Sequence, residues 1–426
     1  MNVRFPEHDT STSEIMVGII GLGAMGRGLL YQTLITPGIR CACVAELDVK
    51  KASQTLRQFG IEHHVIETAK QLSHCIETGV LALCQDGGLL AAVQQLDVVI
   101  EATSAIAEGL RFSEIALKNG NHLVLMNAEI DLIFGSHLHR LAQQHGVHMT
   151  SCDGDQHGVI LRLVKDLRLW GFQLVLGGNI KGFLDRRANP VSIIPEADKR
   201  NLDYKMCASY TDGTKLNVEM ALLANCLGMR AQKTGMHGPR AAEVNQALEL
   251  FDLESMRQSG GGVVDYLLGA KPDGGVFAVG FQDDPWQAEM LNYYKMGSGP
   301  YYLFYRPYHL CHVEAMQCVF DVVAGKPLLQ PLQGFQTNVF AFAKVPLKAG
   351  TLLDGIGGHS CYGLIENTNP KELPLGLPIC LADDVRLKHD VPQDQPIMLA
   401  DVHYSSSAPV FAAYLGSYCA SNVVYS

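Results

Sequence analysis

The segment IMVGIIGLGAMGRGLLYQTL, residues 15–34, decides the fold that this sequence predicts. Its first six residues are apolar and predict a buried strand, and the residues after the turn predict a helix. Gly21, Gly23 and Gly26 form G-x-G-x-x-G between the two. In this context the first glycine permits a tight turn, the second lets the backbone approach a pyrophosphate, and the third lets the helix pack closely on the strand.

This turn predicts a dinucleotide site, with the pyrophosphate at the helix N-terminus beside Ala24 and Met25. Glu46 follows Gly26 by about 20 residues, the spacing of a carboxylate that binds the adenine ribose, and Asp48 is a nearby competitor. A carboxylate repels a 2′-phosphate, so Glu46 slightly favours NAD over NADP, although neighbouring basic side chains could offset this. A glycine-rich turn without a ligand is the alternative.

The first 150 residues alternate short apolar runs with helical patterns. CACVAELD, LDVVIEATS and NHLVLMNAEID are typical of strands, whereas KKASQTLRQFG and GLRFSEIALKNG are typical of helices. This alternation implies right-handed crossovers and a parallel sheet. We therefore expect an α/β fold with an N-terminal Rossmann domain, a doubly wound parallel sheet, over residues 1–150.

Polar residues end two of these strands, at the carboxyl edge where the nicotinamide of a dinucleotide would lie. Thr103 and Ser104 follow one strand, and Asn127 and Glu129 follow the next. For Asn127 and Glu129, strand-end solvation and helix capping are equally acceptable explanations.

The regular alternation of strand and helix patterns ends near residue 151. FQLVLGGNIKG and KMCASYTDGT are candidate strands, and KLNVEMALLANCLG is a strong helix. We expect a central α+β domain over residues 151–330, of which residues 305–330 or so pack back on the Rossmann domain. Short strands and turns then predict a small β-rich domain over residues 331–426.

Composition excludes several classes of function. The formal net charge of −10 and the pI near 5.9 argue against a nucleic-acid or anionic-membrane surface. No uncharged apolar run reaches the length of a membrane helix, and the N-terminus does not resemble a secretory signal. The twelve cysteines form no C-x-x-C pair, which predicts reduced thiols in a cytoplasmic protein.

Lysines and carboxylates in the central domain are candidates for proton transfer. Lys215 and Glu219 are spaced i, i+4 and would share one helix face, as a catalytic pair or as a solvated surface ion pair. Lys181 follows a predicted strand and could be a site residue or an exposed loop lysine. Asp155, like Asp153, could transfer protons or simply cap the following helix.

A second group of residues predicts an anion pocket. The turn GMHGPRA combines cationic side chains with backbone N–H groups, although its glycines could be purely structural. KMGSGPYYLFYRPYHL, residues 295–310, adds further cations among aromatic rings, most of which we expect in the core. The predicted substrate-binding residues are His237, Arg240, Lys295, Ser298, Arg306 and His309.

No residue is assigned to a metal. Asp153, Asp155 and Glu129 could supply oxygen ligands to a divalent cation, but no Cys/His spacing indicates zinc.

Several motifs resemble those of predicted homoserine dehydrogenases with a C-terminal SAF domain, a family that includes the 1-deoxy-D-xylulose 5-phosphate reductoisomerase-like (DRL) enzymes. After the opening glycine turn the motifs are MNAEID, DGDQ, DGTKLNVEMALLAN, GMHGPRA, GGVVDY and KMGSGPYYLFYRPYHL. The resemblance implies a central catalytic and dimerisation domain, a β-clip-like SAF domain at residues 331–426 and a homodimer. The sequence departs from the NADPH-dependent reductoisomerase-like members at Glu46 and at DGDQHG.

Together these patterns predict an NAD(P)-dependent oxidoreductase that acts on a small anionic or phosphorylated hydroxy or keto substrate, with 1-deoxy-D-xylulose 5-phosphate as the candidate that the resemblance suggests. Lys181, Lys215, Asp155 and Glu219 are the predicted catalytic residues. A homoserine dehydrogenase-type enzyme and a non-catalytic dinucleotide-binding regulator are the alternatives.

Overall fold

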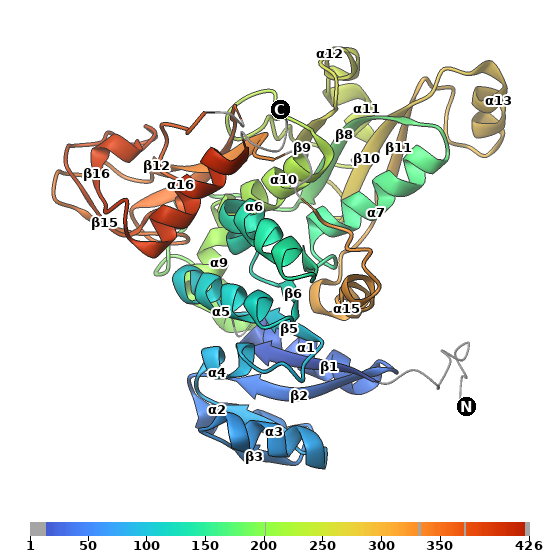
Figure 1. Cartoon of the computed structure of the whole chain (residues 1–426). Helices are drawn as coiled ribbons and strands as arrows, with labels where there is room; N and C mark the ends of the chain where they lie inside the picture. The colour runs from blue at the N-terminus through green and yellow to red at the C-terminus, as the bar shows by residue number, and fades with distance from the viewer. Residues whose placement is uncertain (1–13, 201, 331–333, 370–371, 422–426) are drawn as a thin grey trace. The chain divides into compact units, whose positions relative to one another are not determined.

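The computed structural model describes residues 14–200, 202–330, 334–369 and 372–421. The chain divides into two compact units, each built from separate stretches (Figure 1). Unit 1 contains residues 1–131, 137–154 and 310–330, and unit 2 contains residues 132–136, 155–309 and 331–426. Within the described ranges, no helix combines the length and the apolar character needed to cross a membrane.

Unit 1 contains a seven-stranded sheet in the order β3-β4-β2-β1-β5-β6-β7, in which every neighbouring pair is parallel. The strands are β1 Ile15–Ile20, β2 Ile39–Ala45, β3 His63–Val65, β4 Leu81–Cys84, β5 Val98–Glu101, β6 His122–Leu125 and β7 Met149–Ser151. The helices are α1 Ala24–Ile35, α2 Val49–Gln58, α3 Ala69–Thr78, α4 Gly87–Ala91, α5 Ile106–Lys118, α6 Ala128–Gln144, α14 Cys311–Glu314 and α15 Met316–Val323. The predicted Rossmann fold is confirmed.

The carboxyl end of the central strand β1 is the point of this sheet where a ligand is expected to bind. Strand β1 lies between β2 and β5, so the strand order reverses beside it, and ligands of doubly wound folds bind above such a point. Val17 and Ile19 are fully buried in one core with residues of α15, including Val319 and Val322. The late segment 310–330 therefore completes the core of unit 1.

Unit 2 contains a four-stranded sheet in the order β11-β10-β8-β9 and two small antiparallel sheets, β12-β14 and β13-β15-β16. The strands are β8 Gln173–Lys181, β9 Val263–Leu268, β10 Val276–Phe281, β11 Tyr301–Arg306, β12 Thr337–Ala343, β13 Leu352–Asp354, β14 Cys361–Asn367, β15 Asp383–Leu387 and β16 Val402–His403. The helices are α7 Gln156–Leu169, α8 Ile194–Arg200, α9 Tyr204–Thr211, α10 Thr214–Leu227, α11 Ala247–Leu250, α12 Leu253–Gln258, α13 Pro285–Tyr293 and α16 Pro409–Ser421. The predicted mixed and β-rich architecture of this part of the chain is confirmed.

Helix α10 joins the C-terminal strands to the rest of unit 2. The side-chain oxygen of Thr214 accepts a hydrogen bond from the Gly363 N–H at 2.8 Å, and Asn217 Oδ1 accepts one from the Ile365 N–H at 2.9 Å. Both donors lie on β14. One face of α10 is therefore committed to holding the strands.

The predicted strand KMCASYTDGT, residues 205–214, is wrong, because these residues form α9 and the start of α10. The side chain of Asp203 accepts a hydrogen bond from the Met206 N–H and caps α9, and Cys207 and Ala208 are buried in a small apolar cluster with residues near α8. The few buried residues on this face of α9 give no clear helical period, so the sequence alone predicted a strand here.

Candidate functional site

The glycine turn of unit 1 has the form that a pyrophosphate requires. Gly21 has φ of +94°, and a Cβ there would lie 2.8 Å from the Ala102 carbonyl oxygen. A Cβ on Gly26 would lie 1.9 Å from the Gly21 oxygen, so the third glycine is needed for α1 to approach β1. A Cβ on Gly23 would meet nothing within 4 Å. Open space at the second glycine is what the close approach of a phosphate group needs.

The N-terminus of α1 faces this turn with Ala24 and Met25 in its first turn. The N-cap residue is Gly23, and no side chain caps the helix. Unused N–H groups at a helix N-terminus bind anions because they add to the positive end of the helix dipole.

Glu46 lies directly after β2, beside the glycine turn. Its carboxylate accepts a hydrogen bond from the Leu22 N–H at 2.7 Å and from the Asp48 N–H at 3.3 Å. Asp48 instead caps α2, accepting from the Lys51 N–H at 3.0 Å. Of the two acidic candidates, the carboxylate of Glu46 is thus the one held against the turn.

The carboxyl ends of β5 and β6 bring Thr103 and Asn127 together, whereas Ser104 is exposed. The Asn127 amide donates to the Thr103 carbonyl oxygen at 3.0 Å. Asn127 is the N-cap residue of α6, but its side chain makes no capping hydrogen bond, so capping does not explain it. Glu129 is buried in the first turn of the same helix, where negative charge is favourable.

Glu101 is a buried carboxyl group at this edge that the sequence did not single out. It ends β5, is 0% exposed and accepts hydrogen bonds from the Thr103 N–H and hydroxyl. Burial raises the pKa of Glu101 to about 8 against the lowering effect of those bonds, and the nearby charge of Glu129 raises it further. Glu101 is therefore a neutral carboxylic acid over most of the physiological pH range.

In unit 2, Asp155 is the N-cap residue of α7 by position but makes no side-chain capping hydrogen bond. Helix capping was the alternative for this residue, and the structure does not support it. A carboxylate oxygen of Asp155 lies within 4.8 Å of a ring nitrogen of His309.

In unit 1, Asp153 has a structural role, because its carboxylate accepts a hydrogen bond from the Cys318 thiol at 2.7 Å. Asp153 anchors α15 of its own unit.

Lys215 and Glu219 both lie on the buried part of α10, with 8% and 3% of their surfaces exposed. A solvated surface ion pair was the alternative, and this burial contradicts it. Thr214 and Asn217 occupy the face of α10 that binds β14, whereas Lys215 and Glu219 share a different face of the helix. Charged side chains are rarely buried to this degree without a partner or a function.

His157 is a second residue that the sequence analysis missed. It is the second residue of α7, it is 1% exposed, and neither ring nitrogen has a hydrogen-bond partner among the described residues. Burial lowers the pKa of His157 to about 4; the Asp155 charge opposes this, and the Lys215 and His309 charges reinforce it. The charges that act on His157 thus come from three parts of unit 2, namely α7, α10 and the segment after β11.

Lys181 lies at the carboxyl end of β8 and is partly buried, which differs from the exposed loop lysine that was its alternative. Its ammonium donates to the Tyr210 carbonyl oxygen at 2.7 Å. At the same edge of the sheet, His309 donates from Nδ1 to the Gly274 carbonyl oxygen at 2.7 Å. The carboxyl end of β8 is therefore lined by oriented cationic or polar groups.

The turn GMHGPRA is held by an internal carboxylate. Asp265 on β9 is fully buried and accepts hydrogen bonds from the His237 N–H at 2.9 Å and the Gly238 N–H at 2.8 Å. Burial raises the pKa of Asp265 in spite of these bonds. We expected these N–H groups to bind a substrate anion, but Asp265 already occupies them. The structural alternative for the turn backbone is the correct one, and the side chains of His237 and Arg240 are exposed.

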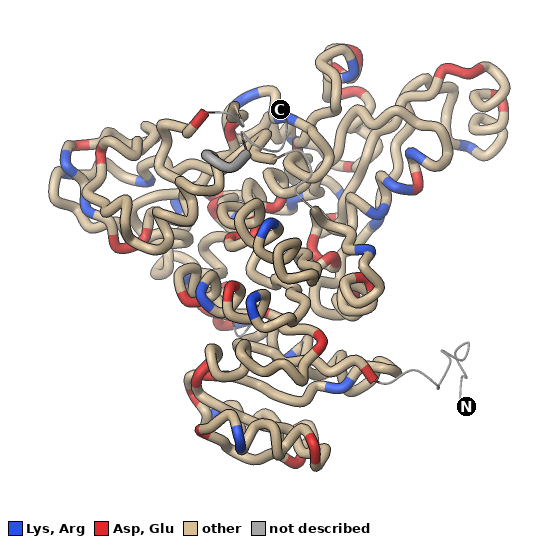
Figure 2. The backbone as a smooth tube through the Cα atoms, viewed as in Figure 1, with Lys and Arg blue, Asp and Glu red and all other residues tan. Residues whose placement is uncertain are grey.

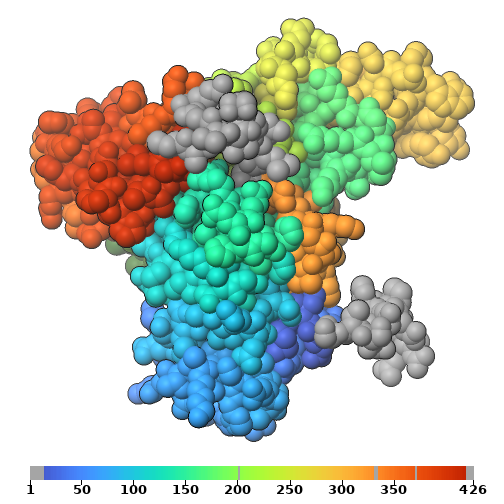
Figure 3. All heavy atoms as spheres, viewed as in Figure 1, coloured from blue at the N-terminus to red at the C-terminus, as the bar shows by residue number. Residues whose placement is uncertain are grey.

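The predicted anion-binding residues do not form one pocket. Lys295 and Ser298 lie between α13, which projects from the rest of unit 2 (Figures 1 and 3), and β11. Arg306 is the last residue of β11, and His309 follows it. Six extended residues separate the two pairs by about 20 Å. Arg240 bridges to Leu268 on β9, the opposite edge strand from β11, which puts it roughly 20 Å from Arg306.

The prediction that most rings of the aromatic stretch lie in the core is wrong. Tyr302 is fully buried, but Tyr305 and Tyr308 are about half exposed. Arg306 stacks on the Tyr308 ring with 4.5 Å between its guanidinium carbon and the ring centre. Basic and acidic residues alternate along the tube without segregating into long blocks of one sign (Figure 2). Of the four anion-binding residues predicted in this stretch, Arg306 and His309 lie at the end of the sheet where Lys181 lies.

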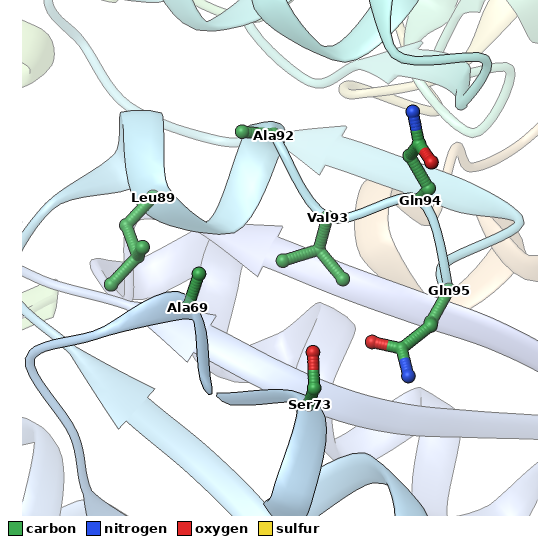
Figure 4. A pocket seen from close by; sticks show the side chains of 7 residues that line it. All are labelled: Ala69, Ser73, Leu89, Ala92, Val93, Gln94 and Gln95. Atoms are coloured by element: carbon green, nitrogen blue, oxygen red, sulfur yellow. The ribbon is translucent and has the colours of Figure 1, made fainter. Parts of the chain in front are cut away.

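A surface pocket of about 310 Å³ lies in unit 1 between α3 and α4 (Figure 4). It is lined by Ala69, Ser73, Leu89, Ala92, Val93, Gln94 and Gln95. These side chains include no acid, base or nucleophilic thiol, and Gln94 and Gln95 precede the amino end of β5. The pocket is therefore separate from the glycine turn, which is at the carboxyl edge.

Residues 154–315 match the family described as oxidoreductase DRL, catalytic domain. No curated protein matches the chain. Among solved structures, a probable dehydrogenase from Thermotoga maritima is 11% identical with a TM-score of 0.42, over 75% of this chain and 92% of that one. A 1-deoxy-D-xylulose 5-phosphate reductoisomerase from Zymomonas mobilis, in complex with NADPH, is 14% identical with a TM-score of 0.34, over 49% and 57%.

A scyllo-inositol dehydrogenase from Lactobacillus casei, solved with NAD(H) and scyllo-inositol, is 15% identical with a TM-score of 0.33, over 63% and 66% of the two chains. The segment that matches the DRL family contains Asp155, His157, Lys181, Lys215 and Glu219. The candidate site of unit 2 thus lies within the part of the chain that is similar to an oxidoreductase catalytic domain.

Proposed function

We propose that the protein is an NAD(P)-dependent oxidoreductase that acts on the CH–OH group, or the corresponding carbonyl, of a small anionic compound. The observation that carries the proposal is the burial of Lys215 and Glu219 on one helix, with the Lys215 and Asp155 charges acting on the buried His157, within a segment that matches an oxidoreductase catalytic domain. A reductoisomerisation of 1-deoxy-D-xylulose 5-phosphate is the specific reaction that we propose first.

The dinucleotide would be held by unit 1. The N–H groups of Ala24 and Met25 and the open turn at Gly23 suit the pyrophosphate, and the Glu46 carboxylate suits two ribose hydroxyls and favours NAD. Thr103, Ser104, Asn127 and Glu129 would flank the nicotinamide, with Gly21 and Gly26 shaping the turn. When bound, the nicotinamide supplies or accepts a hydride.

Lys215 is the proposed proton-transfer residue. In reduction its ammonium gives a proton to the substrate carbonyl oxygen, and in oxidation the neutral amine accepts the hydroxyl proton. Glu219, one helical turn further on, would orient the lysine. Asp155 and Lys181 would orient the substrate, and Arg306 and His309 would attract its anionic group. No divalent cation is needed for this assignment, and added Mg²⁺ is an arm of the test.

We also propose three domains: a Rossmann domain over residues 1–150 that includes residues 305–330 or so, a catalytic and dimerisation domain over 151–330, and a SAF-like domain over 331–426. The two small antiparallel sheets of the C-terminal region support the last of these. A homodimer is part of the proposal and is tested by sedimentation.

The test is to incubate the pure protein with NADPH or NADH and 1-deoxy-D-xylulose 5-phosphate, with and without Mg²⁺, and with homoserine and NAD, while following the nicotinamide absorbance. Lys215→Met should lower kcat at least about 100-fold, whereas Lys199→Met should not, because Lys199 is an exposed lysine paired with Glu196. Turnover of homoserine alone would favour a homoserine dehydrogenase-type enzyme. An unchanged absorbance with every pair would contradict the proposal and leave a dinucleotide-binding regulator.

A further inference from the structure

We propose that His157 binds a hydroxyl group of the substrate beside the oxygen that exchanges a proton with Lys215, so that the substrate is a hydroxyketone or a vicinal diol. This inference rests on the proposed function and names the substrate class for it. His157 is the histidine of DGDQHG, and the other assignments give it no role.

The first step is the unsatisfied hydrogen bonding of the ring. His157 is 1% exposed, and among the described residues neither Nδ1 nor Nε2 has a hydrogen-bond partner. Buried polar atoms are nearly always paired, and an unpaired one destabilises the folded protein. A residue that keeps two such atoms in a packed helix is therefore suited to binding a polar group that the protein does not itself supply.

The second step is the location of the ring. The charges that act on His157 come from Asp155 on its own helix, from Lys215 on α10 and from His309 after β11. The ring is therefore within electrostatic range of groups that the proposed reaction uses. A substrate oxygen that reaches Lys215 would therefore also be near His157.

The third step is the chemistry of the ring. Burial keeps His157 neutral near pH 7, so one nitrogen carries a hydrogen and the other is a bare acceptor. A phosphate or carboxylate needs donors only and leaves the bare nitrogen unpaired. A hydroxyl donates to the bare nitrogen or accepts from the N–H, and two adjacent oxygens of a diol or hydroxyketone satisfy both.

The experiment compares His157→Leu, His157→Asn and His157→Gln with the wild type. For 1-deoxy-D-xylulose 5-phosphate we expect His157→Leu to lower kcat/KM at least about tenfold, mainly through KM, and either amide variant to recover part of the loss. Because leucine leaves no unpaired nitrogen, the unfolding temperature of His157→Leu should equal or exceed that of the wild type.

The matched control is His139→Leu in unit 1, where burial also lowers the histidine pKa to about 4 and Nε2 has no partner among the described residues. This change should leave kcat/KM unaltered. An unchanged KM in His157→Leu, or an unfolding temperature clearly below the wild type, would overturn the inference. If the wild type turns over neither deoxyxylulose phosphate nor homoserine, the proposed function fails, and the unfolding temperature alone decides whether His157 is a structural residue.

Discussion

Glu101 illustrates how burial alone can change what a carboxyl group does. The ordinary pKa of a glutamate is 4.5, but burial raises that of Glu101 to about 8. In the folded protein the group can donate a hydrogen bond near neutral pH, as an ionised carboxylate cannot. The Thr103 N–H and hydroxyl both bind its Oε1 atom, which orients the acid at the edge of the sheet.

The first prediction concerns the pH dependence of stability. The folded protein keeps Glu101 protonated up to about pH 8, whereas the unfolded chain ionises it near 4.5. The associated stabilisation is complete below pH 4.5 and is lost as the pH rises through 8. In urea unfolding between pH 5 and pH 9, Glu101→Gln should remove a decline on the order of 3 kcal/mol. Glu108→Gln, at an exposed position, should keep the decline; equal slopes in wild type and Glu101→Gln would contradict the assignment.

Glu46 supports a prediction on cofactor preference. Glu46→Gln keeps an oxygen that can accept from the Leu22 N–H but removes the negative charge that repels a 2′-phosphate. The ratio of the Kd values for NADPH and NADH, measured by fluorescence titration, should shift about tenfold toward NADPH. Asp48→Asn should leave the ratio unchanged, because asparagine also caps a helix. A constant ratio in Glu46→Gln would show that its carboxylate does not contact the ribose.

At the scale of the element, α10 carries two different tasks on two faces. Asn217 binds the Ile365 N–H, and its amide donates to the Gly213 carbonyl oxygen at 2.8 Å. Glu219 lies two residues further along the helix, on another face, and is equally buried. The same helix therefore offers a structural residue and a proposed catalytic residue of similar exposure.

Substitutions on the two faces should separate stability from activity. Asn217→Ala leaves a buried N–H of β14 unpaired and should lower the free energy of unfolding by about 1–3 kcal/mol, with an unchanged KM. Glu219→Gln should lower kcat by about tenfold or more and change the unfolding free energy by less than about 1 kcal/mol. Denaturant titration and steady-state kinetics on both proteins check this. A loss of kcat in Asn217→Ala with unchanged stability would contradict the structural role of Asn217.

The elements of unit 1 could be predicted because their signals are local: an apolar run, a glycine turn and a fixed spacing led to β1, α1 and Glu46. The site of unit 2 depends on burial, which periodicity alone does not give. Lys215 and Glu219 were found by their spacing, but their burial was not predicted. His157 and Asp265 were missed because a single histidine or aspartate has no sequence pattern. The sequence also did not show that β11 separates Lys295 and Ser298 from Arg306 and His309, because the extent of that strand could not be predicted.

At the scale of the whole molecule, unit 1 is discontinuous in sequence. The core that includes Val17 and Leu29 also includes Met316, Val319 and Val322 of α15. A fragment of residues 1–154 would leave that apolar surface uncovered. Exposed surface of this kind destabilises a fold and promotes association.

A fragment of residues 1–154 should therefore aggregate or unfold at a markedly lower temperature than the same fragment joined to residues 310–330 by a flexible linker. Circular dichroism during heating and light scattering measure the difference, which we expect to be at least about 10 °C. The joined fragment should also bind NADH, because the glycine turn and Glu46 both belong to it. Equal melting of the two fragments would show that α15 is dispensable.

The same discontinuity affects the protein while it is being synthesised. A ribosome must translate all of the chain between Gly154 and Leu310 before α15 can cover its place on the sheet. At 5–20 residues per second this leaves the apolar surface open for on the order of ten seconds. During that interval the nascent chain is a natural client for chaperones.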